Sequence, residues 1–265
     1  MSNAVIKIKE QDLVLKVGNN IKKEVWDDSI YHNFINQLTG SRDYQKEAIL
    51  TALRFMCSGQ YQNTLELAKE NFENNFHLQE KYTTFANLEK QLFSINNYTV
   101  SLDLATGTGK TWVLYGIAAI MLSANKVDQV LVLAPSVTIE EELIEKFKSF
   151  ATDDNLNVLL DMTPPKIING SESIIKNCIC IENRDAIYNN KRSSILDSVE
   201  NEGERTLILS DEVHHVFYSE ENKWKEFIDK INFRYNIGVS GTCYYSNNDY
   251  FNNVIYRYSL KQAME

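Results

Sequence analysis

The feature that most constrains this chain is the segment 97–111, Asn-Tyr-Thr-Val-Ser-Leu-Asp-Leu-Ala-Thr-Gly-Thr-Gly-Lys-Thr. An apolar stretch runs directly into a glycine-containing loop, and Lys110 and Thr111 follow the second glycine. Glycines in such a loop let backbone N–H groups turn inward around a phosphate, and a following helix adds the positive end of its dipole. The segment therefore predicts a strand, a phosphate-binding loop and a helix, in that order.

Composition and charge narrow the class of protein. Of 265 residues, 43% are hydrophobic and 24% are charged, as in a soluble globular protein, and the net charge of −9 argues against tight non-specific binding of nucleic acid by this chain alone. The longest uncharged run, 111–125, is too short to span a bilayer. Lys7, Lys9, Glu10 and Asp12 make the first residues unlike a signal peptide. We expect a cytoplasmic protein with no membrane partner.

The cysteines do not form a disulfide framework in a chain of this length; they are Cys57, Cys178, Cys180 and Cys243. Cys178 and Cys180 alternate as residues of a strand do. The alternative, metal binding or redox use, lacks a second Cys or His pair at ligand spacing.

The order of elements after the phosphate loop predicts an α/β fold. Strands are expected at 98–104 and 129–134, and helices at 109–123 and 137–150. Further apolar runs follow at 157–160, 178–182, 206–210 and 236–239. Helical stretches lie between them, at about 185–200 and 221–231. Alternation of this kind is typical of a mostly parallel sheet with helices on both faces. The dipeptides Pro164-Pro165 and Asn169-Gly170 mark a surface loop.

The residues before the loop predict an extension and an insertion. Residues 5–17 alternate apolar and charged side chains and indicate one or two edge strands, whereas 42–57 has helical spacing. Residues 63–95 indicate one or two amphipathic helices, either a packed insertion or a partner-binding or substrate-guiding one. We expect an N-terminal extension over 1–40 and a nucleotide-binding domain over 41–265.

The loop residues have the chemistry of a nucleotide site. Ala105, Thr106, Gly107, Thr108 and Gly109 would surround the phosphates. The general pattern has a glycine five residues before the last one, where this chain has Leu104 followed by Ala105. Lys110 can reach the β- and γ-phosphates, and the Thr111 hydroxyl can hold Mg²⁺. The expected ligands are therefore ATP and Mg²⁺.

A second motif places two carboxylates at the end of an apolar strand that begins at Thr206. Asp211 suits a direct or indirect contact with Mg²⁺, and Glu212 can orient an attacking water. The alternative is a solvated turn. His214 and His215 follow, and we interpret them as coupling residues beside the nucleotide rather than as zinc ligands, with a packed core histidine as the alternative for one of them.

Two weaker motifs complete the set. At the end of another apolar strand, the hydroxyls of Ser240 and Thr242 could relay a change at the γ-phosphate. At a predicted helix start, Gln45 offers a donor and an acceptor to an adenine, and Tyr44 offers a ring face. The alternative for Tyr44 is a plain core residue.

Together these motifs resemble those of the first RecA-like ATPase domain of superfamily 2 helicases and translocases. Residues 42–49 resemble that family's adenine-reading segment, and 105–111 resemble its motif I. Residues 131–136, 211–214 and 240–242 resemble motifs Ia, II and III.

The resemblance implies a RecA-like P-loop NTPase fold and assigns roles to residues. It implies catalytic roles for Lys110, Asp211, Glu212 and His214. It implies coupling by Ser240, Gly241 and Thr242, and contact with a nucleic-acid backbone by Ala134, Pro135 and Ser136.

Within the superfamily, Leu-Ala-Thr-Gly-Thr-Gly-Lys-Thr with Asp-Glu-Val-His-His is most similar to the motor subunit of type III restriction enzymes. Residues 254–263 resemble the segment by which those proteins pass into a second motor domain. The resemblance implies DNA, more than RNA, and a methyltransferase or specificity subunit as partners. We expect the second motor domain, its arginine finger and any nuclease to lie outside these residues, and hence only weak ATP hydrolysis by this chain alone.

The leading hypothesis is an ATP-hydrolysing motor domain of a DNA helicase or translocase. The main alternative is a non-motor module in which bound ATP orders a partner surface. Intact Lys110, Asp211 and Glu212 argue against that alternative, because a pure binder need not keep a water-orienting carboxylate. A P-loop enzyme acting on a small molecule, such as a kinase, is a third hypothesis.

Overall fold

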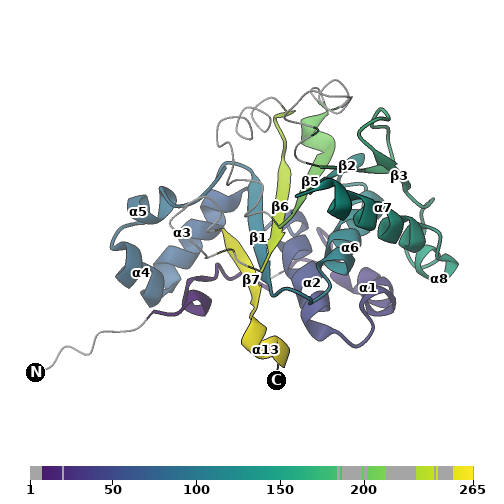
Figure 1. Ribbon diagram of the computed structural model, residues 1–265. Coiled ribbons are helices and arrows are strands. Elements are labelled where there is room, and N and C mark those ends of the chain that lie inside the picture. The colour runs from purple at the N-terminus through teal and green to yellow at the C-terminus, as the bar shows by residue number, and fades with distance from the viewer. Residues whose placement is uncertain are drawn as a thin grey trace, which may run out of the picture.

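The computed structural model describes residues 8–19, 21–183, 186, 199, 202–212, 231–241, 243 and 253–264. Among these residues, seven strands form one sheet in the order β3-β4-β2-β5-β6-β1-β7 (Figure 1). The strands are β1 Tyr98–Leu104, β2 Gln129–Ala134, β3 Lys166–Asn169, β4 Cys178–Asn183, β5 Thr206–Asp211, β6 Tyr235–Ser240 and β7 Val254–Tyr258. Every pairing is parallel, which confirms the predicted α/β fold class.

One face of the sheet shares a large hydrophobic core with four helices: α1 His32–Thr39, α2 Asp43–Cys57, α6 Lys110–Ser123 and α7 Val137–Ala151. Helix α6 carries no charge after Lys110 and is buried on almost every side, as expected of a helix at the centre of a domain. Tyr115 of α6 meets Phe147 of α7 edge to face, with ring centroids 5.2 Å apart. These helices therefore hold the phosphate loop, which lies between β1 and α6, on a rigid base.

The other face of the sheet has its own hydrophobic cluster. Leu131 and Leu133 of β2 lie there with Cys178 and Cys180 of β4, so the two cysteines alternate in a strand as predicted. Val199 and Ile231, both in helical conformation, belong to the same cluster. Most of the predicted helical stretches 185–200 and 221–231 lies outside the described residues.

The predicted insertion consists of three short helices instead of one or two: α3 Thr64–Asn74, α4 Phe76–Tyr82 and α5 Phe85–Glu89. The breaks follow from two capping side chains, since Asn75 accepts from the first N–H groups of α4 and Thr84 accepts from Asn87 N of α5. Leu67, Leu78 and Leu88 belong to the same core as β1. The insertion lies beside the β1–β7 side of the sheet (Figure 1).

The predicted N-terminal edge strands are wrong for the described part, residues 8–19. Glu10–Leu13 forms a 3-10 helix, η1, and no strand follows it before residue 19. The physical reason is that a side chain already hydrogen-bonds the backbone groups through which a strand would pair with its neighbour. The amide of Asn71 bonds both the N–H and the C=O of Lys16, and Leu15 N makes one bond to Val254 O of β7.

A second correction concerns residues 157–170. The apolar run 157–160 ends helix α8, Asp154–Asn157, and continues as a turn rather than a strand. Strand β3 lies inside the region predicted to be a surface loop. Its middle residues Ile167 and Ile168 are buried against α7 and β4, and this tertiary burial outweighs the nearby Pro165 and Gly170.

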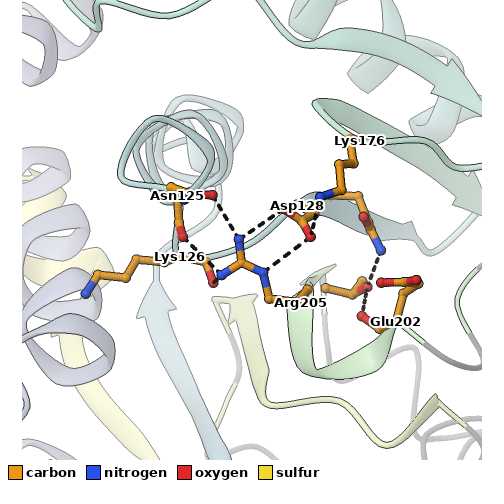
Figure 2. A network of polar contacts seen from close by, with 8 residues as sticks. Asn125, Lys126, Asp128, Lys176, Glu202 and Arg205 are labelled. Atoms are coloured by element: carbon orange, nitrogen blue, oxygen red, sulfur yellow. Dashed lines mark hydrogen bonds and ion pairs between the residues drawn. The ribbon is translucent and has the colours of Figure 1, made fainter.

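A network of polar contacts joins the amino-terminal ends of β2 and β5 (Figure 2). The guanidinium of Arg205 donates to Asp128 Oδ1 at 3.0 Å and to the carbonyls of Asn125 and Lys126 at 3.0 and 3.1 Å. Lys176 adds an ion pair to Asp128 at 3.5 Å. This network lies at the opposite end of the strands from the phosphate loop. None of the described helices is long and apolar enough to cross a membrane.

Candidate nucleotide-binding site

The phosphate loop leaves the carboxyl end of β1, a strand buried along its whole length between β6 and β7. Ligands bind at this edge of open parallel sheets. Gly107 and Gly109 have φ values of +81° and +75°, in the left-handed region that favours glycine. An added Cβ at Gly107 would meet nothing within 4 Å, so there is open space beside the loop for a phosphate. Gly109 caps the amino end of α6, the end that attracts anions.

Tyr44 and Gln45 lie against this loop, as the sequence predicted for residues of one nucleotide site. Tyr44 Oη donates to Thr108 O at 3.0 Å, and Gln45 Nε2 donates to the same oxygen at 2.6 Å. Gln45 is fully buried, and its Oε1 has no hydrogen-bond partner within the described part of the chain. An added Cβ at Gly109 would lie 2.6 Å from Gln45 Nε2, so the glycine is also needed for space.

Lys110 and Glu212 form an ion pair across the site, through Nζ and Oε1. The other carboxylate oxygen of Glu212 accepts from Ser240 Oγ at 3.3 Å. Glu212 has a φ of +46°, an uncommon conformation for a residue with a side chain, and such conformations concentrate at functional sites. Lys110 and Ser240, which belong to two of the predicted motifs, thus both contact Glu212, which belongs to a third.

Asp211 is buried beside this pair. Burial raises its pKa to about 6, Lys110 acts to lower it, and the charge of Glu212 raises it. Its Oδ1 accepts from Glu212 N at 3.0 Å. Within the described residues no three His, Cys, Asp or Glu side chains gather as a metal site. Mg²⁺ commonly binds through one or two side chains plus substrate phosphates, so the oxygens of Asp211 and Thr111 fit that ion.

Gly241 brings the end of β6 against the phosphate loop. An added Cβ there would lie 3.0 Å from Leu104 O and 3.1 Å from Thr106 N. A side chain here would force these backbone atoms to move by a few tenths of an ångström, so glycine favours this close approach. Two predicted site residues, His214 and Thr242, lie outside the described residues.

The segment predicted to contact nucleic acid follows β2 at the same edge of the sheet. Ala134 is fully buried, Pro135 is partly exposed and Ser136 is exposed. Ser136 Oγ also caps α7 by accepting from Ile139 N at 3.4 Å. Of the three residues predicted to contact nucleic acid, Pro135 and Ser136 therefore have side chains that a ligand could reach.

Three residues of the site escaped the sequence analysis. Arg257 of β7 makes an ion pair with Asp103 of β1, at 3.4 Å, and a second one with Glu10. Burial raises the pKa of Asp103 to about 6, against the lowering effect of Arg257. Tyr258 stacks on Tyr44. The available signal was a charge inside an otherwise uncharged strand, since Asp103 and Arg257 are the single charged residues of β1 and β7.

A scan against protein families matches residues 38–245 to the family described as "Type III restriction enzyme, res subunit". The chain belongs to this family. The parallel sheet and the phosphate loop agree with the RecA-like helicase domain that the sequence motifs predicted.

A search of solved structures finds that this ResIII-family chain is similar to the UvsW helicase from bacteriophage T4, with 14% sequence identity and a TM-score of 0.37. The match covers 56% of this chain and 48% of the helicase chain, so it spans about half of that protein. A search of curated proteins finds no match.

Proposed function

We propose that this chain is the ATP-binding, ATP-hydrolysing motor domain of a DNA helicase or translocase of the type III restriction kind. The observation that carries the proposal is the direct pairing of Lys110 in the phosphate loop with Glu212 at the end of β5. A merely structural loop has no need to hold a water-orienting carboxylate against its lysine. The division into an extension over 1–40 and a motor domain over 41–265, and a cytoplasmic location, are part of the proposal.

Binding of ATP would begin with the phosphates in the loop. The backbone N–H groups of Gly107 and Gly109 and the amino end of α6 would supply donors for the phosphate oxygens. Lys110 would then separate from Glu212 and bind the γ-phosphate instead. Thr111 and Asp211 would hold Mg²⁺, which neutralises charge on the β- and γ-phosphates.

Release from Lys110 would free the Glu212 carboxylate for its catalytic task. A water that donates a hydrogen bond to this carboxylate is oriented for attack on the γ-phosphorus, in line with the leaving oxygen. Phosphoryl transfer depends mainly on such positioning and on charge neutralisation. In this proposal the arginine finger comes from the second motor domain, so we expect residues 1–265 alone to turn over ATP slowly.

Coupling to nucleic acid would run through the ends of neighbouring strands. Ser240 contacts Glu212, and Gly241 lies against the loop, which supports a route by which a change at the γ-phosphate would reach β6. Pro135 and Ser136, at the same edge, would contact the backbone of DNA, which the family membership favours over RNA. The second motor domain and a methyltransferase or specificity subunit are the proposed partners.

The test measures ATP binding and hydrolysis by residues 1–265, with and without DNA. Wild type should bind ATP and hydrolyse it slowly. Glu212→Gln should still bind ATP and lose turnover, while Glu141→Gln, at an exposed position of α7, serves as the matched control. Turnover that is unchanged in Glu212→Gln would exclude the proposed catalytic role. Fast, DNA-stimulated turnover by wild type would support a motor but contradict the slow basal rate.

A further inference from the structure

The ring of Tyr258 lies flat on the ring of Tyr44. The centroids are 4.2 Å apart and the planes differ by 5°. One face of Tyr44 is therefore covered by a residue from the far end of the chain. A base that stacks on Tyr44 must use the opposite face or displace Tyr258.

The backbone fixes Tyr258 relative to the phosphate loop. Tyr258 lies in register with Leu104, the last residue of β1, and Ala105 N donates to Tyr258 O at 3.0 Å. The Tyr258 hydroxyl donates to Gln262 O at 3.0 Å, within α13 (Leu260–Met264). The backbone of Tyr258 therefore lies directly beside the beginning of the phosphate loop.

Tyr44 is in turn held at both its hydroxyl and its ring. Its hydroxyl donates to Thr108 O inside the loop, and its ring rests on Tyr258. A side chain that is fixed at two points loses little freedom when a ligand binds, which favours stacking on its remaining face.

We propose that Tyr258 is a positioning residue for the nucleotide base: it acts through Tyr44, holding that ring at the angle at which it stacks on a purine. The inference rests on the proposed function and deepens it. It also assigns a role to β7, the strand that leads out of the sheet beside the loop. A ligand without a base uses the phosphate part of the site alone, so the two contributions can be measured separately.

The experiment compares the binding of ATP and of inorganic tripolyphosphate by calorimetric titration of the full chain. Tyr258→Leu removes the ring, and ATP affinity should fall roughly two- to tenfold, the range measured for aromatic pairs. The affinity for tripolyphosphate should stay unchanged, because that ligand has no base. Tyr258→Phe keeps the ring and should bind both ligands like wild type.

Two further variants isolate the pathway through Tyr44. In a Tyr44→Leu background, Tyr258→Leu should cause no additional loss of ATP affinity. Tyr256→Leu is the matched control, because it removes a ring from the same strand and the same side without a stack on Tyr44. Should Tyr258→Leu not fold, Tyr258→Val takes its place, since valine suits an edge strand.

Several results would overturn the inference. An equal loss of ATP and tripolyphosphate affinity in Tyr258→Leu would show a structural role only. Unchanged ATP binding would show no role, and tighter ATP binding would show that Tyr258 occupies the place of the base. Wild type that binds both ligands equally well would refute a base site while leaving the phosphate site intact. Wild type that binds neither would refute the proposed function as well.

Discussion

In the free chain, Lys110 is paired with Glu212. A nucleotide phosphate would have to replace Glu212 as the partner of Lys110. The ion pair between Lys110 and Glu212 is partly buried, with side-chain exposures of 10% and 24%. In the proposed function it must open before Lys110 can reach a phosphate, because the two proposed catalytic side chains are paired with each other in the free chain. Ion pairs between exposed side chains are worth up to about 1 kcal/mol, and this value sets the scale of the effect.

The first prediction follows from that competition. Glu212→Gln should bind ATP up to about fivefold more tightly than wild type, because its side chain no longer holds the Lys110 ammonium. Calorimetric titration with a non-hydrolysable ATP analogue measures this without interference from turnover. Glu141→Gln should bind like wild type. Weaker binding by Glu212→Gln would mean that Glu212 helps to hold the nucleotide.

Asp211 leads to a prediction about stability. Its folded-state pKa of about 6 exceeds its ordinary value of 3.8 because of burial. The folded state therefore holds the proton more tightly, and the stabilisation linked to the proton is present below pH 3.8 and lost as the pH rises through 6. At pH 7.5, Asp211→Asn should be more stable than wild type by about 1–3 kcal/mol.

Thermal unfolding without nucleotide at pH 7.5 and pH 5 measures this effect. The advantage of Asp211→Asn should shrink at the lower pH, where wild type takes up its proton. Asp103, whose pKa is also raised to about 6, is present in both proteins, so its contribution cancels. An advantage that does not change with pH would contradict the assignment to Asp211.

Gly241 provides a steric prediction. Gly241→Ala should destabilise the chain by about 1–3 kcal/mol, because the new Cβ would press on backbone atoms of Leu104 and Thr106. Gly18→Ala is the matched control, since the atoms nearest to its Cβ would belong to the flexible side chain of Gln60 and not to the backbone. Urea unfolding compares the two. Equal effects would mean that the contact between β6 and the loop is not tight.

At the scale of elements, the two ends of the sheet have separate tasks. The carboxyl ends of β1, β5 and β6 bring the site residues together, whereas the amino ends of β2 and β5 are joined by Arg205 and Asp128 (Figure 2). The planar guanidinium of Arg205 makes five hydrogen bonds at once, more than the three donors of a lysine ammonium can supply. The network therefore stabilises the end of the sheet that is remote from the phosphate loop.

Arg205→Lys should consequently lower the free energy of unfolding by about 1–2 kcal/mol and leave ATP affinity unchanged. Arg205 is partly exposed, which limits the size of the effect. Urea unfolding and an ATP titration of the same variant check both parts. A loss of ATP affinity in a folded variant would contradict the separation of tasks.

Elements with strong local patterns were predictable from the sequence. Strands β1 and β2 and helices α2, α6 and α7 lie within a residue or so of their predicted positions, because their apolar periodicity agrees with their burial. Strand β3 and helix η1 were not predictable. Tertiary burial makes Ile167 and Ile168 a strand next to two prolines, and the Asn71 amide takes the backbone groups of Lys16.

At the scale of the whole molecule, the sequence predicted that these motifs meet in one site. It did not predict how the last strand, β7, contributes to that site. The motifs at 105–111, 211–212 and 240–241 converge because a parallel sheet brings the carboxyl ends of its strands to one edge. The place of β7 depends on contacts with distant residues: Arg257 with Asp103, and Leu15 with Val254. No local pattern encodes such contacts.

The central claim is that ATP binds in the loop 105–111 with Lys110 on its phosphates. The most direct test is a calorimetric titration of Mg·ATP into wild type and Lys110→Ala. Wild type should bind one ATP per chain, and Lys110→Ala should bind roughly ten- to a hundredfold more weakly, the usual cost of losing a hydrogen bond to a charged group. Equal affinity in the two proteins would contradict the claim.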